Sequence, residues 1–114
     1  MHELYLAESI LNIVQEYKAK QNFSKVNSIT LSFGRLSCIE PKSLQFAFEV
    51  QAKNTLAENA TLEIQIMPAV IHCFSCEKDL EVETYSALCP QCGGEEVMLT
   101  GGTEELQIME MDVD

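Results

Sequence analysis

Two C-x-x-C pairs, Cys73 with Cys76 and Cys89 with Cys92, constrain this chain more than any other feature. Each pair lets two sulfurs reach one ion within a tight turn, and two such knuckles complete a tetrahedral site. The second knuckle also contains Pro90 and a following Gly-Gly pair, which supply the rigid and permissive backbone that such a turn needs. The spacing predicts a zinc ion, and a closed four-thiolate shell predicts a structural role for it rather than a catalytic one.

Two other interpretations of these cysteines remain open. Disulfides are disfavoured because the chain has five cysteines, an odd number, and its N-terminus does not resemble a signal peptide. We therefore expect a reducing, cytoplasmic location. A rubredoxin-like iron site would share the second knuckle, but Glu77 follows Cys76 where that pattern has a glycine. A colourless purified protein would exclude iron.

Three residues near these motifs have uncertain roles. His72 lies beside Cys73 and could exchange into the metal site as pH changes, although a solvated neighbour is the simpler interpretation. Cys38 is expected to be a small buried side chain rather than a ligand. Glu40 precedes a predicted helix, where a carboxylate usually favours the helix dipole, but it could also approach the N-terminus and contact a metal there.

Charge and composition exclude several function classes. Seven Lys and Arg against 18 Asp and Glu give a formal charge of −11, which would repel phosphate backbones and predicts no nucleic-acid role. No apolar run is long enough to cross a bilayer, so we expect no membrane association. The chain has only two histidines, no nucleophile–base motif and no phosphate-binding loop, so we expect no catalytic residues and no enzymatic activity.

Hydrophobic periodicity predicts a small α+β fold. A helical pattern covers residues 4–20, an alternating strand covers 26–34, a second helix starts at Pro41, and a second strand covers 61–67 and pairs with the first. A last extended run covers about 105–113, and its apolar residues change phase. Either a bulge, which we prefer, or burial of both faces of the strand would explain this change. We expect a small sheet packed with two helices, formed by residues 1–69 and 100–114, with residues 70–99 as an inserted zinc-ribbon-like module.

The chain has no Trp, so its large core side chains must come from other aromatic residues. The expected core aromatics are Phe23, Phe33, Phe46, Phe48, Tyr5 and Tyr17.

The N-terminal Met1-His2-Glu3 offers a second kind of metal site. The α-amine, a backbone amide nitrogen and the His2 imidazole can form fused chelate rings, and this nitrogen-rich, tetragonal geometry suits Ni(II) or Cu(II). Glu3 or a further backbone nitrogen could complete the coordination. The motif alone is weak, because an exposed terminus with no metal is the more common arrangement.

The motifs together resemble the HypA/HybF family of hydrogenase maturation nickel chaperones. The matching segments span nearly the whole chain and include the paired knuckles, Met1-His2-Glu3-Leu4, Ser32-Phe33-Gly34-Arg35-Leu36-Ser37 and Gly102-Thr103-Glu104-Glu105-Leu106. The resemblance implies that His2 is the main nickel ligand, assisted by Met1 and Glu3, and that Cys73, Cys76, Cys89 and Cys92 hold zinc.

The resemblance also implies a delivery function. Family members pass Ni(II) to the large-subunit precursor of NiFe hydrogenase, working with the GTPase HypB, and some also serve urease maturation proteins. The alternative is a structural zinc-ribbon module for protein interaction, because such ribbons occur with many functions. Nickel binding by the zinc-loaded protein would distinguish these two functions.

Overall fold

The computed structural model describes residues 2–114 and divides the chain into two compact units. The helical unit contains the chain up to Leu31, together with Ile39–Gln65 and Gln107–Asp114. The cysteine unit contains Ser32–Cys38 and Ile66–Leu106. Among the described residues, no helix combines the length and apolar character that crossing a membrane requires.

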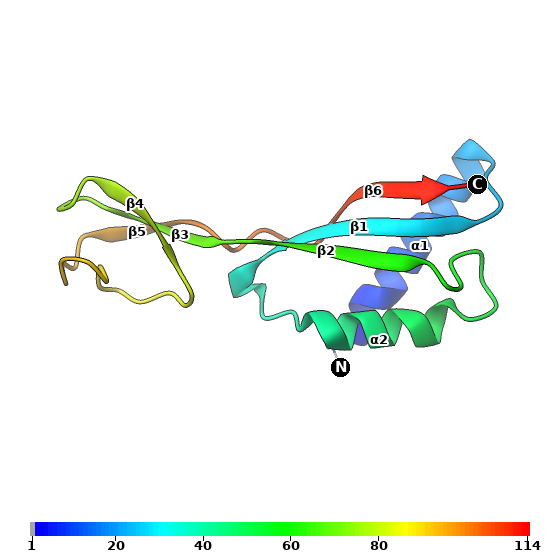
Figure 1. The fold of residues 1–114 in the computed structure, drawn as a ribbon, viewed down its shortest axis with the longest axis horizontal. Coiled ribbons are helices and arrows are strands. Elements are labelled where there is room, and N and C mark those ends of the chain that lie inside the picture. Colours follow the sequence, from blue (N-terminus) through cyan, green and yellow to red (C-terminus); the bar gives the residue numbers. More distant parts are fainter. Residues whose placement is uncertain (1) are drawn as a thin grey trace. The chain divides into compact units, whose positions relative to one another are not determined.

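The helical unit combines two helices with a three-stranded sheet (Figure 1). Its elements are α1 (His2–Gln21), most of β1 (Val26–Gly34), α2 (Pro41–Ala52), most of β2 (Thr61–Met67) and β6 (Gln107–Val113). The last residues of β1 and β2 belong to the cysteine unit, as does the 3-10 turn that follows β1, η1 (Arg35–Ser37). The strand order is β2-β1-β6, so β2 pairs with β1 as predicted. The α+β fold class predicted from the sequence is confirmed.

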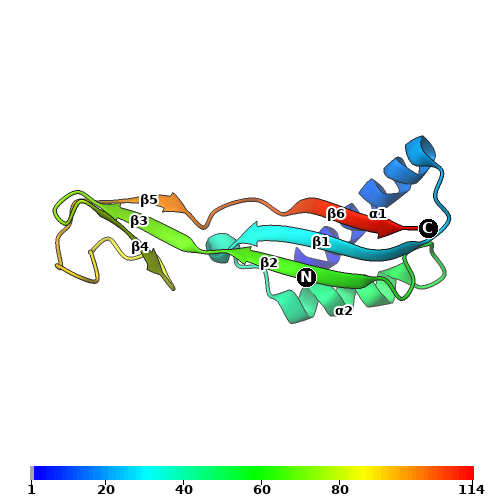
Figure 2. The same ribbon diagram turned by 45° about the horizontal axis from the view of Figure 1, so that its top comes forward.

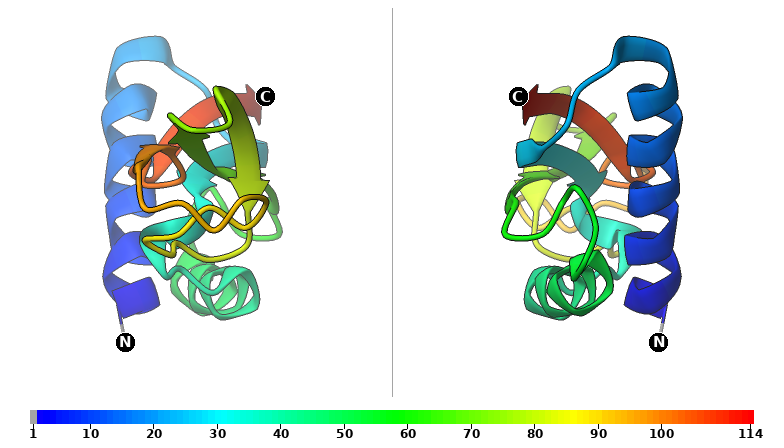
Figure 3. Two further views of the ribbon diagram at one scale, coloured as in Figure 1. Left: turned by 90° about the vertical axis from the view of Figure 1, so that its left-hand side faces the viewer. Right: turned by 90° about the vertical axis from the view of Figure 1, so that its right-hand side faces the viewer.

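Capping residues and backbone conformation explain where the two helices begin and end. α1 ends at Gln21, and the next residue, Asn22, has a left-handed φ of 52° and an N–H that donates to the Lys18 carbonyl at 3.1 Å. α2 starts with Pro41 in its first turn and is capped by Glu40, whose carboxylate accepts a hydrogen bond from the Lys42 N–H at 3.1 Å. In the end-on views of Figure 3, α2 lies near the N-terminal end of α1.

The core of the helical unit follows the predicted helical and strand faces. It is formed by one face of each helix and by alternate residues of β1: Ala7, Ile10, Val14, Ile29, Leu31, Leu44, Ala47 and Phe48. Each fully buried Val, Leu, Ile or Phe contributes about 1.5–3 kcal/mol relative to an exposed one. These faces hold the helices and the sheet together.

Three of the six aromatic residues expected in the core are exposed. Phe23, Phe33 and Phe48 are buried as predicted, whereas Tyr5, Tyr17 and Phe46 are 74%, 40% and 68% exposed. Phe46 lies two helical positions from both Leu44 and Phe48, a rotation of about 200° that turns it to the opposite face. The expectation based on side-chain size was wrong because helical phase, not size, decides which residues are buried.

The cysteine unit contains a second sheet, whose strands were not among the elements predicted from the sequence (Figure 2). The strands β3 (Ala69–Cys73), β4 (Lys78–Val82) and β5 (Val97–Gly101) pair antiparallel in the order β4-β3-β5. Alternate residues of β3 are buried, namely Ala69, Ile71 and Cys73. This alternation fixes which side chains share a face with the cysteines.

The last strand changes phase along its length. Ile108, Met111 and Val113 are half-buried, while Met109 is 56% exposed. The buried face therefore shifts by one residue between Ile108 and Met111. A β-bulge produces this kind of shift, and the exposure of Met109 argues against burial of both faces.

Candidate metal centre

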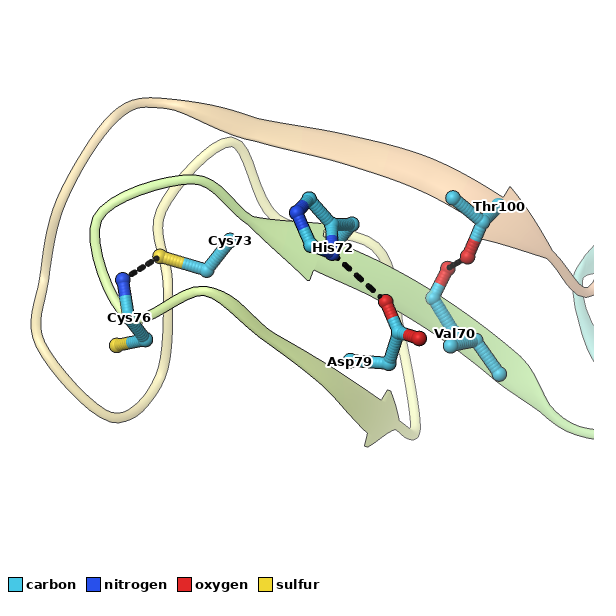
Figure 4. A network of polar contacts seen from close by, with 6 residues as sticks. All are labelled: Val70, His72, Cys73, Cys76, Asp79 and Thr100. Atoms are coloured by element: carbon cyan, nitrogen blue, oxygen red, sulfur yellow. Dashed lines mark hydrogen bonds and ion pairs between the residues drawn. The ribbon is translucent and has the colours of Figure 1, made fainter.

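The four knuckle cysteines come together at one end of the β4-β3-β5 sheet. Cys73 is the last residue of β3, Cys76 lies in the turn to β4, and Cys89 and Cys92 lie in the loop between β4 and β5. Cys73 and Cys89 are buried, and Figure 4 shows Cys73 and Cys76 in the first knuckle. The structure thus unites residues that are up to 19 positions apart in the chain.

The sulfur positions fit a tetrahedral zinc ion. The Sγ atoms of Cys73 and Cys92 are 3.7 Å apart, those of Cys76 and Cys89 are 3.9 Å apart, and all four lie within 4.8 Å of one another. Zn–S bonds of about 2.3 Å in a regular tetrahedron place sulfurs about 3.8 Å apart. A disulfide needs sulfurs about 2.05 Å apart, and all four cysteines are free thiols.

Backbone geometry shapes both knuckles. The N–H of Cys76 donates to Cys73 Sγ at 3.4 Å, and the N–H of Gly94 donates to Cys92 Sγ at 3.4 Å. Gly93 has a φ of 72° in the second knuckle, and Glu77 has a φ of 55° directly after the first. A left-handed conformation is costly for a residue with a side chain, so Glu77 fills a position where glycine would be less strained.

The thiols have unequal pKa values when no metal is bound. The backbone amide of Cys92 lowers the pKa of Cys89 to about 7. Hydrogen bonding with the side chain of Cys92, followed by burial, raises the pKa of Cys76 to about 12. Cys89 therefore supplies thiolate near neutral pH, while Cys76 must lose a proton when a metal ion binds.

His72 lies on the face of the sheet opposite to Cys73. Successive strand residues point to opposite faces, and His72 Nδ1 lies 2.8 Å from Asp79 Oδ1 across the β3–β4 pair (Figure 4). The imidazole is therefore oriented away from the sulfur cluster and paired with a carboxylate, rather than simply solvated. Sequence patterns missed Asp79, because its position opposite His72 becomes apparent only once β3 and β4 are known to form a hairpin.

The N-terminal motif begins α1. Met1 lies outside the described residues, and His2 is described only as the first residue of the helix. Glu3 Oε2 accepts a hydrogen bond from the backbone N–H of Glu40 at 3.3 Å, and Gln51 Nε2 donates to the Leu4 carbonyl at 3.0 Å. The first turn of α1 is therefore fixed against the start and the last turn of α2.

Cys38 is separate from the sulfur cluster. It is exposed, with a left-handed φ of 64°, and its thiol lies 3.7 Å from the Leu36 carbonyl. The expectation that Cys38 is buried was wrong. It follows η1, none of whose residues is buried, so the turn that carries Cys38 lies at the surface.

A known protein family matches nearly the whole sequence. The family model described as "Hydrogenase/urease nickel incorporation, metallochaperone, hypA" matches residues 1–113. A hydrogenase maturation factor HypA from Syntrophus aciditrophicus is 53% identical over 114 residues, covering all of both chains. A hydrogenase maturation factor HypA 2 from Bradyrhizobium diazoefficiens is 43% identical over the same length, again with full coverage.

Solved structures share the fold at lower sequence identity. The solution structure of the nickel metallochaperone HypA from Helicobacter pylori has a TM-score of 0.62 and 18% identity, covering 97% of this chain and 96% of that one. A second solution structure of a HypA protein has a TM-score of 0.68 and 20% identity, covering 99% and 96%. At these identities the similarity supports the fold alone.

Proposed function

The chain belongs to the HypA family of nickel-incorporation metallochaperones for hydrogenase maturation, and from this premise we propose that it delivers Ni(II) from its N-terminus to the hydrogenase large-subunit precursor. The family resemblance expected from the sequence is confirmed. The family consists of metallochaperones rather than enzymes, which also confirms the expectation that the chain is not an enzyme.

The proposed nickel ligands are the Met1 amine, the His2 backbone amide and the His2 imidazole. The first N–H groups of a helix have no intrahelical partners, so a metal ion can replace the proton of the His2 amide, which leaves to solvent, without breaking the helix. The positive end of the helix dipole favours the resulting anionic nitrogen. Fused chelate rings of this kind give the tetragonal geometry that Ni(II) prefers.

The contact between Glu3 and Glu40 is the observation that best supports this site. It holds the first turn of α1 at a defined place on the helical unit, next to the start of α2. The Glu3 carboxylate lies next to the proposed ligands in sequence and can offset the charge of the ion. A site at a chain terminus also suits cargo that must be bound and then released.

We further propose that Cys73, Cys76, Cys89 and Cys92 hold zinc permanently. Their geometry fits a closed tetrahedron, which leaves no position for exchangeable cargo. Nickel would then be bound by the segment that starts the helical unit, and zinc by the cysteine unit. This division of roles follows the two units of the structure.

The proposed partners are a HypB-type GTPase and the large-subunit precursor of NiFe hydrogenase, with urease maturation proteins as a further possibility. The family description includes urease as well as hydrogenase, which supports testing both. A formal charge of −11 favours basic protein surfaces over nucleic acid. The cytoplasmic location expected from the sequence stays a prediction.

Nickel transfer to the hydrogenase precursor tests this proposal directly. Zinc-loaded protein carrying radioactive nickel should pass the metal to a purified large-subunit precursor when the GTPase and GTP are present. A variant with one extra glycine before Met1 should transfer much less, because its amine can no longer share a chelate ring with the His2 imidazole. Equal transfer by both proteins would contradict the proposed ligand set.

The alternative, a zinc-ribbon module with no cargo, makes a different prediction in the same assay. Such a protein would acquire no nickel beyond what its cysteines take up in exchange for zinc. Nickel that appears only as zinc is lost would support this alternative.

A further inference from the structure

One face of the β4-β3-β5 sheet points away from the buried cysteines, and we call it the outer face. Residues directly opposite each other in antiparallel strands share a face, and residues two apart along a strand do so as well. The outer face therefore carries Val70, His72, Phe74, Asp79, Glu81 and Met98. The opposite face carries Ala69, Ile71 and Cys73, which form the small core of the cysteine unit.

The centre of the outer face is apolar and open to solvent. Phe74 and Met98 are 52% and 51% exposed, although both are large hydrophobic side chains. The ring of Phe74 packs edge-on against the imidazole of His72, with centroids 4.7 Å apart, and Met98 is the cross-strand neighbour of His72. A connected aromatic and thioether surface of this kind is typical of contact sites for other molecules.

Hydrogen-bond acceptors border this surface. His72 Nδ1 lies 2.8 Å from Asp79 Oδ1, so the imidazole and this carboxylate form a polar pair on the outer face. Glu81 lies opposite Val70 and is exposed. The outer face thus combines two carboxylates and an imidazole with an exposed aromatic ring.

Neither of the two cationic side chains of the cysteine unit neutralises this face. Lys78 lies opposite Cys73 and therefore on the other face, and Arg35 is paired with Glu83 at 2.6 Å. Eight carboxylates against these two cations give the unit a formal charge of −6. Four thiolates around a divalent ion would add two further negative charges.

We propose that the outer face is a docking site for an arginine-bearing extended segment of a partner protein. A guanidinium group can stack on the exposed ring of Phe74 and donate paired hydrogen bonds to a carboxylate, and its flanking apolar side chains can cover Met98. A second copy of this chain is a poor occupant, because two surfaces of the same negative charge would repel each other. The proposal does not depend on nickel binding.

Chemical-shift mapping of the zinc-loaded, nickel-free protein tests this surface. The probe is a capped pentapeptide that alternates arginine and leucine, and a peptide with glutamate in place of arginine is its control. The arginine peptide should shift the amide signals of residues 70–74, 79–81 and 97–100 in a saturable manner, and the glutamate peptide should not. Shifts spread evenly over all acidic segments of the chain would overturn the proposal.

Matched variants separate specific docking from general attraction to an acidic protein. Glu81→Gln should weaken binding of the arginine peptide about two- to fivefold, as expected for loss of one exposed ion pair. Phe74→Leu should weaken it about threefold while keeping an apolar side chain in the knuckle. Glu95→Gln makes the same charge change at an exposed position in the loop before β5, outside the three strands, and should have little effect.

Two results would refute the proposal. One is an equal loss of affinity in Glu95→Gln and Glu81→Gln. The other is a concentration-dependent shift of the outer-face signals without any peptide, which would show that a second copy of the chain covers this face.

Discussion

At Gly34 the backbone leaves no room for a side chain. A Cβ atom there would lie 2.2 Å from the Gly102 carbonyl oxygen and 2.6 Å from the Glu104 nitrogen. The close approach is fixed by hydrogen bonds from the Gly34 N–H to the Glu104 carbonyl at 2.9 Å and from the Leu36 N–H to the Gly102 carbonyl at 2.7 Å. These contacts join Ser32–Cys38 to the rest of the cysteine unit.

Gly34→Ala should therefore destabilise the protein by about 1–3 kcal/mol, the range for an atom forced into filled space. Gly101→Ala is the matched control, because a Cβ at Gly101 meets its nearest neighbour at 3.6 Å, an ordinary contact. Urea denaturation of the two zinc-loaded variants measures both values. Equal stability of the two variants would show that the backbone at Gly34 can move aside at little cost.

The strands β3, β4 and β5 are too short to form a stable sheet without help. Each has five residues, and the buried residues of β3 amount to one isoleucine, one alanine and one cysteine. A structural zinc ion contributes roughly 10–16 kcal/mol of apparent binding energy near neutral pH, enough to order a segment of this size. The sheet and its metal site are therefore expected to form together.

Removing zinc should unfold the β4-β3-β5 sheet and leave the β2-β1-β6 sheet intact. The helical unit has its own core from α1, α2 and β1, which contains no cysteine ligand. Hydrogen exchange followed by NMR, before and after a strong chelator, distinguishes the two sheets. Persistent protection of β3 amides in the metal-free protein would contradict this account, and restored protection after zinc is added back is the control.

The longer elements could be predicted from the sequence, and the shorter ones could not. The helices and the strands β1 and β2 show clear periodicity over seven or more residues, and β6 forms an extended run of seven residues whose phase changes once. β3 follows β2 with only Pro68 between them. The proline indicated where β2 ends, but it did not indicate that another strand begins directly after it. β4 mixes Lys, Asp and Glu with two apolar residues, and a pattern so polar and so short does not predict a strand.

At the scale of the whole molecule, we propose that the chain combines two kinds of metal chemistry, with nickel bound by the helical unit and zinc by the cysteine unit. The cysteine ligands could be predicted because their spacing is local, and the structure brings all four together. The His72–Asp79 contact could not, since its partners face each other only once β3 and β4 form a hairpin. The sequence raised an approach of Glu40 to the N-terminus as one of two interpretations, and the Glu3–Glu40 contact agrees with it.

The central claim is that exchangeable nickel binds at the start of the chain and not among the sulfurs. The chain has two histidines, His2 in the proposed nickel site and His72 on the outer face of the cysteine unit, and each serves as the control for the other. Both variants should keep their zinc, because neither histidine belongs to the four-sulfur cluster.

Calorimetric titration of nickel into the zinc-loaded wild type, His2→Ala and His72→Ala proteins tests this claim most directly, with zinc content measured in each. We predict a saturable isotherm for the wild type and for His72→Ala, and none for His2→Ala. A full isotherm in His2→Ala, or its loss in His72→Ala, would contradict the account.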